Sequence, residues 1–135
     1  MITVSDKSRL ALQALVELSR RPASTPVPIV EVASARAIPL HIVEQLFGGL
    51  RRAGILQSQR GVKGGYSFRR PASEVTVNAV IAAVDGEPDL AGLDDGPIDS
   101  VLRGAAEGFR DVLEGVTVAE LAQREAQSRA PMFHI

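Results

Sequence analysis

Prolines and glycines divide the first 70 residues into short segments, and these divisions limit what the chain can fold into. Three prolines fall between residues 20 and 28, Pro39 follows a second segment, and Gly54 follows a third. Proline stops a helix and glycine commonly ends one. Within the segments, apolar residues recur at intervals of three and four, the spacing of a helix with one buried face. The sequence predicts three short helices, over residues 7–18, over residues 29–36 and from Leu40 to Gly54.

A β-hairpin is predicted directly after the third helix. Residues 55–59 and 66–69 have the pattern of strands, and the glycine-rich segment 60–65 between them has the pattern of a turn. Two short helices joined by a few residues and braced by a preceding helix make a helix-turn-helix, and a hairpin after it makes a wing. Arg60 and Lys63 stand on flexible glycine backbone, which can approach a phosphate or enter a minor groove. We therefore predict a mainly α-helical chain with a small β-hairpin wing.

The charges of the chain are distributed unevenly. Residues 1–70 hold 11 Lys+Arg and 4 Asp+Glu, a balance of +7, whereas residues 71–135 hold 4 and 12, a balance of −8. Affinity for nucleic acids depends largely on neutralising phosphates with Lys and Arg. The basic half is therefore predicted to face double-stranded DNA. Solvated surface charge is the alternative that the charge count alone leaves open.

Polar residues of the third predicted helix are candidates for reading bases. His41, Glu44, Gln45 and Gly48 recur at intervals of three and four, on the side opposite the apolar residues. Glutamate can accept a hydrogen bond from the amino group of cytosine, and glutamine can make two hydrogen bonds to adenine. An ordinary polar surface is the alternative until the wing is taken into account.

Residues 71–135 are predicted to hold a short helix over 77–84, an acidic loop over 85–99, a long helix from Ile98 and a last helix starting at Thr117. The acidic loop lacks the spacing of a calcium-binding loop, so its carboxylates are interpreted as solvated charge. Two glycines within the long helix cost about 1 kcal/mol each relative to alanine, so a partner helix has to support it. The apolar seam that would meet this partner alternates spacings of four and three: Ile98, Leu102, Ala105, Phe109, Val112 and Val116.

Catalysis and resident cofactors are not expected. The chain has no cysteine, which excludes a disulfide framework, a thiolate metal site and a cysteine nucleophile. His41 and His134 lie far apart, and neither has a companion at the spacing of a metal site or a hydrolytic triad. Segment 60–65 lacks the Gly-Lys-Ser/Thr that opens a helix in phosphate-binding loops. We predict no enzyme, no metal and no cofactor.

The longest apolar run, residues 79–84, is far shorter than the ~20 residues of a membrane span, and no signal-peptide block is present. We expect a cytoplasmic, nucleoid-associated protein without membrane contact. Its 135 residues suffice for one domain. We assign residues 1–70 to a winged helix-turn-helix region and residues 71–135 to the post-wing helix, acidic loop and dimerisation helix, within one integrated domain.

The motifs resemble the Rrf-type winged helix-turn-helix transcriptional regulators of bacteria. The specific part of the similarity comprises Ile38-Pro39 and the segments 43–47 (VEQLF), 50–56 (LRRAGIL), 58–61 (SQRG) and 64–68 (GGYSF), and weaker similarity covers nearly the whole chain. The resemblance implies a homodimer whose long helix crosses that of its partner. It also implies two winged helix-turn-helix units on adjacent turns of a palindromic operator, with repression as the expected mode of regulation.

The resemblance also implies residue roles. Glu44 occupies the position of the base-reading acid, with His41 and Gln45 beside it, and Arg60 occupies that of the wing arginine that enters the minor groove. Further phosphate contacts are expected from Lys7, Arg51 and Arg52.

One departure from the family concerns its cofactor. Cluster-binding members carry three cysteines between the post-wing helix and the dimer helix, and the corresponding residues 87–97 contain none. Asp99 lies where some members have a ligand histidine and is interpreted as a helix-start residue. No iron–sulfur cluster is expected, so control falls to a protein partner, to a small molecule between the DNA-binding half and the dimer helix, or to abundance. In the alternative function, the acidic half docks another protein and DNA binding is secondary.

Overall fold

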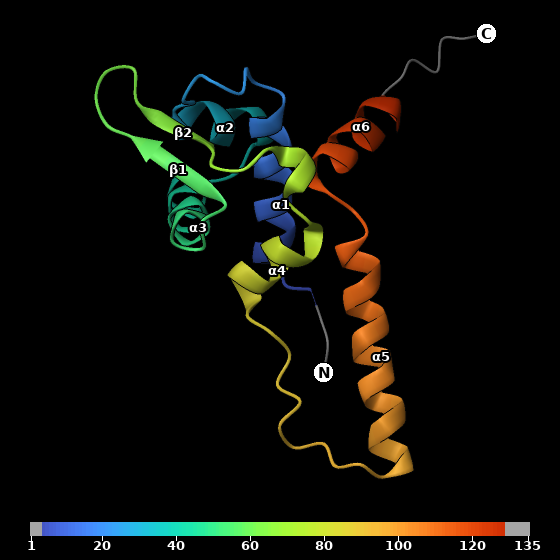
Figure 1. Ribbon diagram of the computed structural model, residues 1–135. Helices are drawn as coiled ribbons and strands as arrows, with labels where there is room; N and C mark the ends of the chain where they lie inside the picture. The colour runs from blue at the N-terminus through green and yellow to red at the C-terminus, as the bar shows by residue number, and fades with distance from the viewer. Residues whose placement is uncertain (1–3, 129–135) are drawn as a thin grey trace, which may run out of the picture.

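The computed structural model describes residues 4–128, and its first three helices confirm the predicted helix-turn-helix. They are α1 (Asp6–Ser19), α2 (Ile29–Arg36) and α3 (Leu40–Arg52) (Figure 1). Helix α1 is capped by Ser5, whose hydroxyl accepts a hydrogen bond from the Ser8 amide. Helix α2 ends at Ala37, which has a φ of 53°, and this left-handed residue turns the chain into α3.

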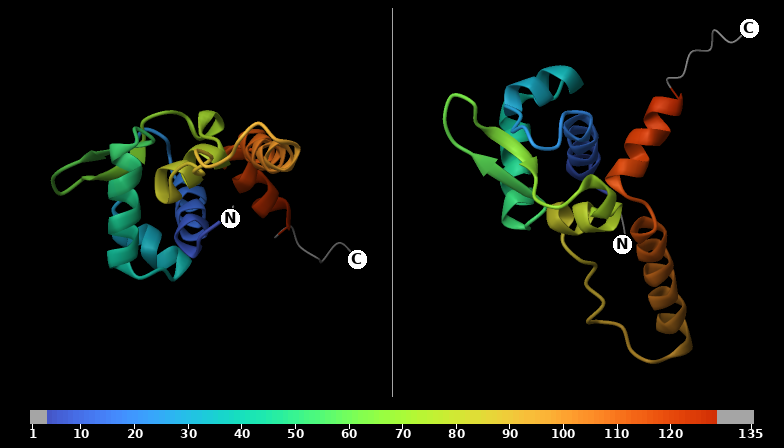
Figure 2. Two further views of the ribbon diagram at one scale, coloured as in Figure 1. Left: turned by 90° about the horizontal axis from the view of Figure 1, so that it is seen from below. Right: turned by 45° about the horizontal axis from the view of Figure 1, so that its top comes forward.

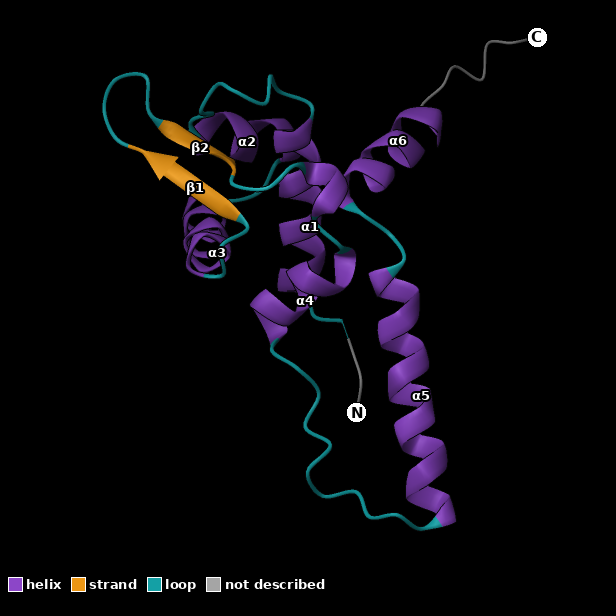
Figure 3. Ribbon diagram, viewed as in Figure 1, coloured by secondary structure: helices purple, strands orange, loops and turns teal. Residues whose placement is uncertain are grey.

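The wing consists of two antiparallel strands, β1 (Leu56–Gln59) and β2 (Gly65–Phe68), which pair from Leu56 opposite Phe68 to Gln59 opposite Gly65 (Figure 3). Strand β1 is one residue shorter than predicted, and β2 begins and ends one residue earlier than predicted. Strand β2 is tied to the loop after α1, because Val27 and Tyr66 exchange two backbone hydrogen bonds of 2.8 Å. Gly65 has a φ of 149°, and a Cβ there would lie 2.3 Å from the Val27 carbonyl. Glycine is therefore required at this crossing.

The hydrophobic core lies between α1, α2, α3 and the wing. Its fully buried side chains include Leu15, Phe47, Leu50 and Ile55. The ring of Phe47 meets the ring of Tyr66 edge-on, with centroids 5.3 Å apart and an interplanar angle of 64°. This ring contact joins α3, which is the second helix of the helix-turn-helix and its candidate recognition helix, to the wing.

The second half of the chain partly covers this core and partly leaves it. Helices η1 (Ala72–Glu74) and α4 (Val77–Asp85) pack on the body, α5 (Pro97–Glu114) extends away from it, and α6 (Val118–Ser128) returns to lie beside α1 (Figure 1). Two backbone hydrogen bonds hold the start of α6 against the start of α4. Val77 N–H donates to the Val116 carbonyl, and Val118 N–H donates to the Val75 carbonyl. The side chain of Val118 is fully buried in the core that α1 and α3 form.

Both predicted ends of the acidic loop were wrong. The acidic loop spans residues 86–96, because Asp85 still belongs to α4 and the long helix begins at Pro97, a residue suited to a first helical turn. Leu40 follows the apolar spacing of α3, but its side chain is exposed. The predicted end of the last helix, near Pro131, lies outside the described residues, as does His134. No helix within residues 4–128 is long and apolar enough to cross a membrane.

The end of α4 is fastened to the start of α1 through one carboxylate. Asp85 accepts hydrogen bonds from the amide and hydroxyl of Ser5 and, at 2.8 Å, from the hydroxyl of the buried Ser8. Desolvation of the carboxylate raises its pKa, but the hydrogen bonds from Ser5 and Ser8 lower it by more. The pKa of Asp85 therefore lies below its ordinary value of 3.8.

Asp85→Asn is expected to lower stability at neutral pH by an amount that shrinks on acidification. Because the folded-state pKa is depressed, the contribution of the carboxylate is full above the unfolded-state pKa of about 3.9 and is lost as the pH falls through the folded value. Urea unfolding of wild type and variant between pH 7 and pH 3 measures this difference. Asp95→Asn is the matched control, since Asp95 makes none of the side-chain hydrogen bonds or ion pairs that the structure describes. A difference independent of pH would contradict the assignment.

Candidate nucleic-acid interface

Helix α3 presents one buried face and one exposed polar face. Val43, Phe47 and Leu50 are buried, whereas His41, Glu44 and Gln45 are exposed. These three polar side chains make no hydrogen bond or ion pair within residues 4–128. The structure thus brings the predicted base-reading residues together on one free surface of the recognition helix.

The wing lies beside α3 on the side of the molecule away from α5 (Figures 1 and 2). Arg60 and Lys63 are exposed in its turn, on either side of the fully exposed Val62. A Cβ at Gly64 would lie 2.2 Å from the Gln59 carbonyl, so the turn closes tightly only with glycine there. The wing therefore holds two cations at its tip, and its strand β1 packs against α3.

Within residues 4–128, the cations of the predicted interface have no carboxylate partner. The ion pairs that the structure describes join residues of α1, α2, α6 and the turn after α1. Arg51 donates a hydrogen bond of 3.2 Å to the hydroxyl of Ser58 in β1, and it too is exposed. The cations of α3 and the wing are thus available to phosphates. Lys7 lies apart from them, in the first turn of α1 near Asp85.

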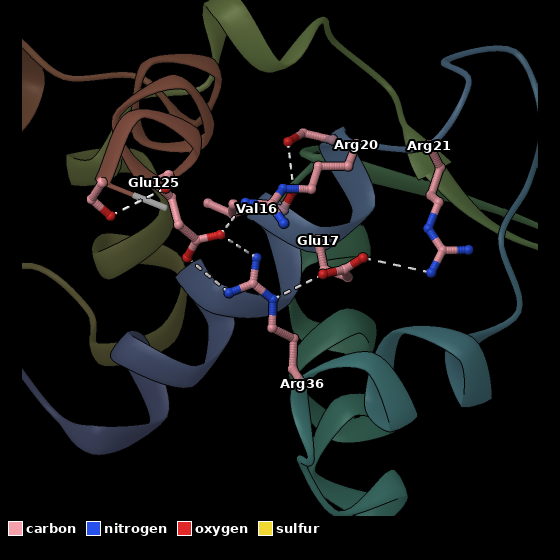
Figure 4. A network of polar contacts seen from close by, with 8 residues as sticks. Val16, Glu17, Arg20, Arg21, Arg36 and Glu125 are labelled. Atoms are coloured by element: carbon pink, nitrogen blue, oxygen red, sulfur yellow. Dashed lines mark hydrogen bonds and ion pairs between the residues drawn. The ribbon is translucent and has the colours of Figure 1, made fainter. Parts of the chain in front are cut away.

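A network of ion pairs fixes α2, the first helix of the helix-turn-helix (Figure 4). The side chain of Arg36 is only 8% exposed and bonds to Glu17 of α1 at 3.0 Å and to Glu125 of α6 at 2.7 and 2.9 Å. The hydrogen bond to Glu125 raises the pKa of Arg36, desolvation opposes this, and Glu17 adds to the increase. Arg20 also pairs with Glu125. Sequence reasoning missed this network, because its partners are up to 105 residues apart.

Helix α5 exposes an apolar face. Ala106 is its only buried residue, while much of the predicted seam lies in solvent. Val101, which the narrow seam of the sequence omitted, belongs to the same exposed face, and a wider apolar stripe beginning at Ile98 would have included it. Phe109 and Val116 of the seam are half-buried, and Ala105 is exposed. The exposed fractions of the large side chains are Ile98 76%, Val101 72%, Val112 69% and Leu102 52%.

The acidic loop is built from hydrogen-bonded turns. The carboxylate of Asp89 accepts from the Ala91 amide, that of Asp94 from the Gly96 amide, and that of Asp99, in the first turn of α5, from the Asp94 amide. A cavity of about 930 Å³ lies between the start of this loop, α4 and α5. Its lining includes Asp85, Glu87, Asp89, Glu107, Phe109 and Arg110.

A braced helix-turn-helix, a free polar face on its second helix and a basic wing on the same side define a winged helix-turn-helix DNA-binding protein. The family model for Rrf2, an iron-dependent transcriptional regulator, matches residues 4–124. The HTH-type transcriptional regulator IscR of Serratia proteamaculans (strain 568) is 32% identical over 131 residues, covering 90% of this chain and 80% of the relative.

Solved structures agree. T. potens IscR superposes with a TM-score of 0.80 at 25% identity, covering 97% of this chain and 93% of the other. CymR (YrzC), the global cysteine regulator of B. subtilis, superposes with a TM-score of 0.79 at 28% identity, covering 92% and 98%. The chain belongs to the Rrf2 family of transcriptional regulators, which are not enzymes.

The residues of this chain do not fit an iron–sulfur cluster. Such clusters are held by cysteine thiolates, with histidine replacing some of them. The 135 residues include no cysteine. Within residues 4–128, no group of three His, Asp or Glu side chains is placed to hold a metal ion. The description of the family includes iron dependence, but this chain lacks the cysteine ligands that an iron–sulfur cluster needs.

Proposed function

We propose that this chain is a sequence-specific repressor that binds a palindromic operator as a homodimer, without an iron–sulfur cluster. The observation that carries the proposal is the free polar face of α3 beside the basic wing, since these cations and hydrogen-bonding groups have no carboxylate partner within the described part of the chain. Repression is the proposed mode because a dimer seated on a promoter excludes other proteins from the DNA that it covers.

The exposed apolar face of α5 supports the homodimer. An 18-residue helix with Ile98, Val101 and Val112 in solvent loses favourable burial energy unless another surface covers it. A Cβ at Gly104 or Gly108 would have no atom within 4 Å, so a second helix can approach closely there. A second copy of α5 has the same face, which a two-fold axis makes complementary to itself. The wings and the recognition helices remain outside this contact.

Selection of genomic DNA fragments by the purified protein at about 150 mM salt tests the proposal, because nonspecific attraction to phosphates is weakened there. We expect a few sites that share a palindrome, with half-site centres one helical turn apart, about 34 Å, or a multiple of it. Recovery of random fragments alone would contradict the proposal and would favour the alternative in which the acidic half docks another protein.

Glu44→Ala is expected to relax the preference of the protein at one base pair of each half-site. A carboxylate that accepts from the amino group of cytosine contributes about 1–3 kcal/mol of discrimination, or about 5- to 150-fold in relative affinity. Binding of a panel of single base-pair operator variants measures this ratio. Glu74→Ala is the control, since it removes the same charge from an exposed site in η1. An unchanged ranking of the operator variants would show that Glu44 does not read a base.

A further inference from the structure

Two adjacent glycines lie within the recognition helix, α3. Glycine within a helix costs about 1 kcal/mol relative to alanine, so Gly48 and Gly49 together weaken α3. Their φ angles are not in the left-handed region, and a Cβ at either position would meet only the guanidinium of Arg52, at 3.5 and 3.7 Å. These are ordinary contact distances, so alanine would fit at both positions. The packing of the protein itself therefore does not require the bare backbone.

The guanidinium of Arg52 lies over this bare backbone. Arg52 is the last residue of α3, and helical side chains lean toward the N-terminus of their helix. Its Nη1 lies near Gly48 and its Nη2 near Gly49, one turn back from its own Cα. The adjacent Arg51 is directed elsewhere, toward Ser58 of β1.

Arg52 thereby joins the exposed polar row of α3. It follows Gln45 by seven residues and Gly48 by four, so these residues lie on the same helical face as His41. Arg52 is exposed and takes part in none of the hydrogen bonds or ion pairs described between residues 4 and 128. An arginine extended beyond the end of the helix would reach a phosphate, whereas this one holds its charge in line with the candidate base-reading side chains.

We propose that Arg52 reads a guanine in the major groove, and that Gly48 and Gly49 form the seat on which its guanidinium lies. The inference rests on the proposed function, in which α3 enters that groove. Arginine donates two parallel hydrogen bonds to O6 and N7 of guanine, and its planar fork makes the contact specific. Side chains larger than alanine at the two glycines would occupy the seat and hold DNA away from the helix. This role replaces the phosphate contact that the sequence led us to expect.

Parallel selections from a randomised duplex library, with wild type and variants, test the proposal. Arg52→Lys keeps the charge but lacks the fork, so we expect the wild-type motif with one G·C preference per half-site reduced about 10- to 100-fold. The slope of log K against log salt stays unchanged, because the charge is retained. Arg110→Lys, at an exposed position of α5 outside α3 and the wing, is the matched control and should retain that preference. Gly48→Leu, which fills the seat, should lose the same preference and bind all sites more weakly, while keeping its helical circular dichroism and thermal transition.

The outcomes separate this proposal from the function on which it rests. If Arg52→Lys keeps the complete motif, and Arg52→Gln weakens all sites equally and lowers the salt slope by about 1, Arg52 contacts a phosphate and the proposal is overturned while the proposed function stands. If wild type selects no motif, the proposed function fails, and the reading role of Arg52 fails with it.

Discussion

Phe47→Ala is expected to lower the free energy of unfolding by about 3–5 kcal/mol, a large part of the ~5–15 kcal/mol by which a domain of this size is stable. Phe47 is fully buried in α3, and its ring packs edge-on against Tyr66 of the wing. Truncation removes this contact and leaves a cavity between the two elements of the candidate interface. Urea unfolding followed by circular dichroism measures the loss. We also expect weaker operator binding, because the recognition helix and the wing lose their common support.

Two variants make the Phe47 result interpretable. Phe47→Leu keeps much of the buried volume and should cost less than Phe47→Ala. Val30→Ala removes apolar atoms from an exposed side chain of α2 and should change stability by less than about 0.5 kcal/mol. A loss below 1 kcal/mol for Phe47→Ala would mean that the ring is not a core contact of the folded protein.

The double substitution Val101→Asp and Leu102→Asp is expected to convert a dimer into a monomer. Both side chains lie on the exposed apolar face of α5, and pairing two copies would bury the introduced carboxylates without partners. Losing the dimer removes the linkage between two half-site contacts, so operator affinity should fall by about 10²- to 10⁴-fold. Sedimentation velocity and operator titration measure the two effects.

Asp111→Lys is the matched control for the α5 variant. It changes the net charge by the same amount in the opposite sense, at an exposed position on another face of the helix. It should remain a dimer. A double variant that still sediments as a dimer would place the homodimer contact elsewhere, and a monomeric wild type would refute the proposed homodimer.

Local signals were sufficient to predict much of the fold. Ser5 and Thr76 cap the helices that follow them, and α2 spans the predicted residues. Capping, proline and glycine signals act within a few residues, so one sequence contains all the information that they need. Periodicity failed at Leu40, which follows the apolar spacing but lies in the first turn of α3, where its side chain remains exposed.

Contacts distant in sequence could not be predicted in this way. Nothing in the periodicity indicates that the backbone of Gly65 packs against that of Val27, or that Arg36 forms hydrogen bonds with Glu125. The site shows the same limit. Arg51 and Arg52 are neighbours of one residue type and were assigned the same role, yet a helix turns by about 100° per residue and directs them to different surroundings. The roles of these two arginines in DNA binding remain predictions.

The ion network around Arg36 has a consequence for synthesis on the ribosome. Glu125 is translated 89 residues after Arg36, an interval on the order of ten seconds at about 5–20 residues per second. During this interval Arg36 has Glu17 as its only described carboxylate partner, and the place of Val118 in the core is empty. We expect the nascent helix-turn-helix to stay loosely folded until α6 emerges and docks. A prematurely terminated chain would then be cleared by proteases before it could compete with the finished regulator for DNA.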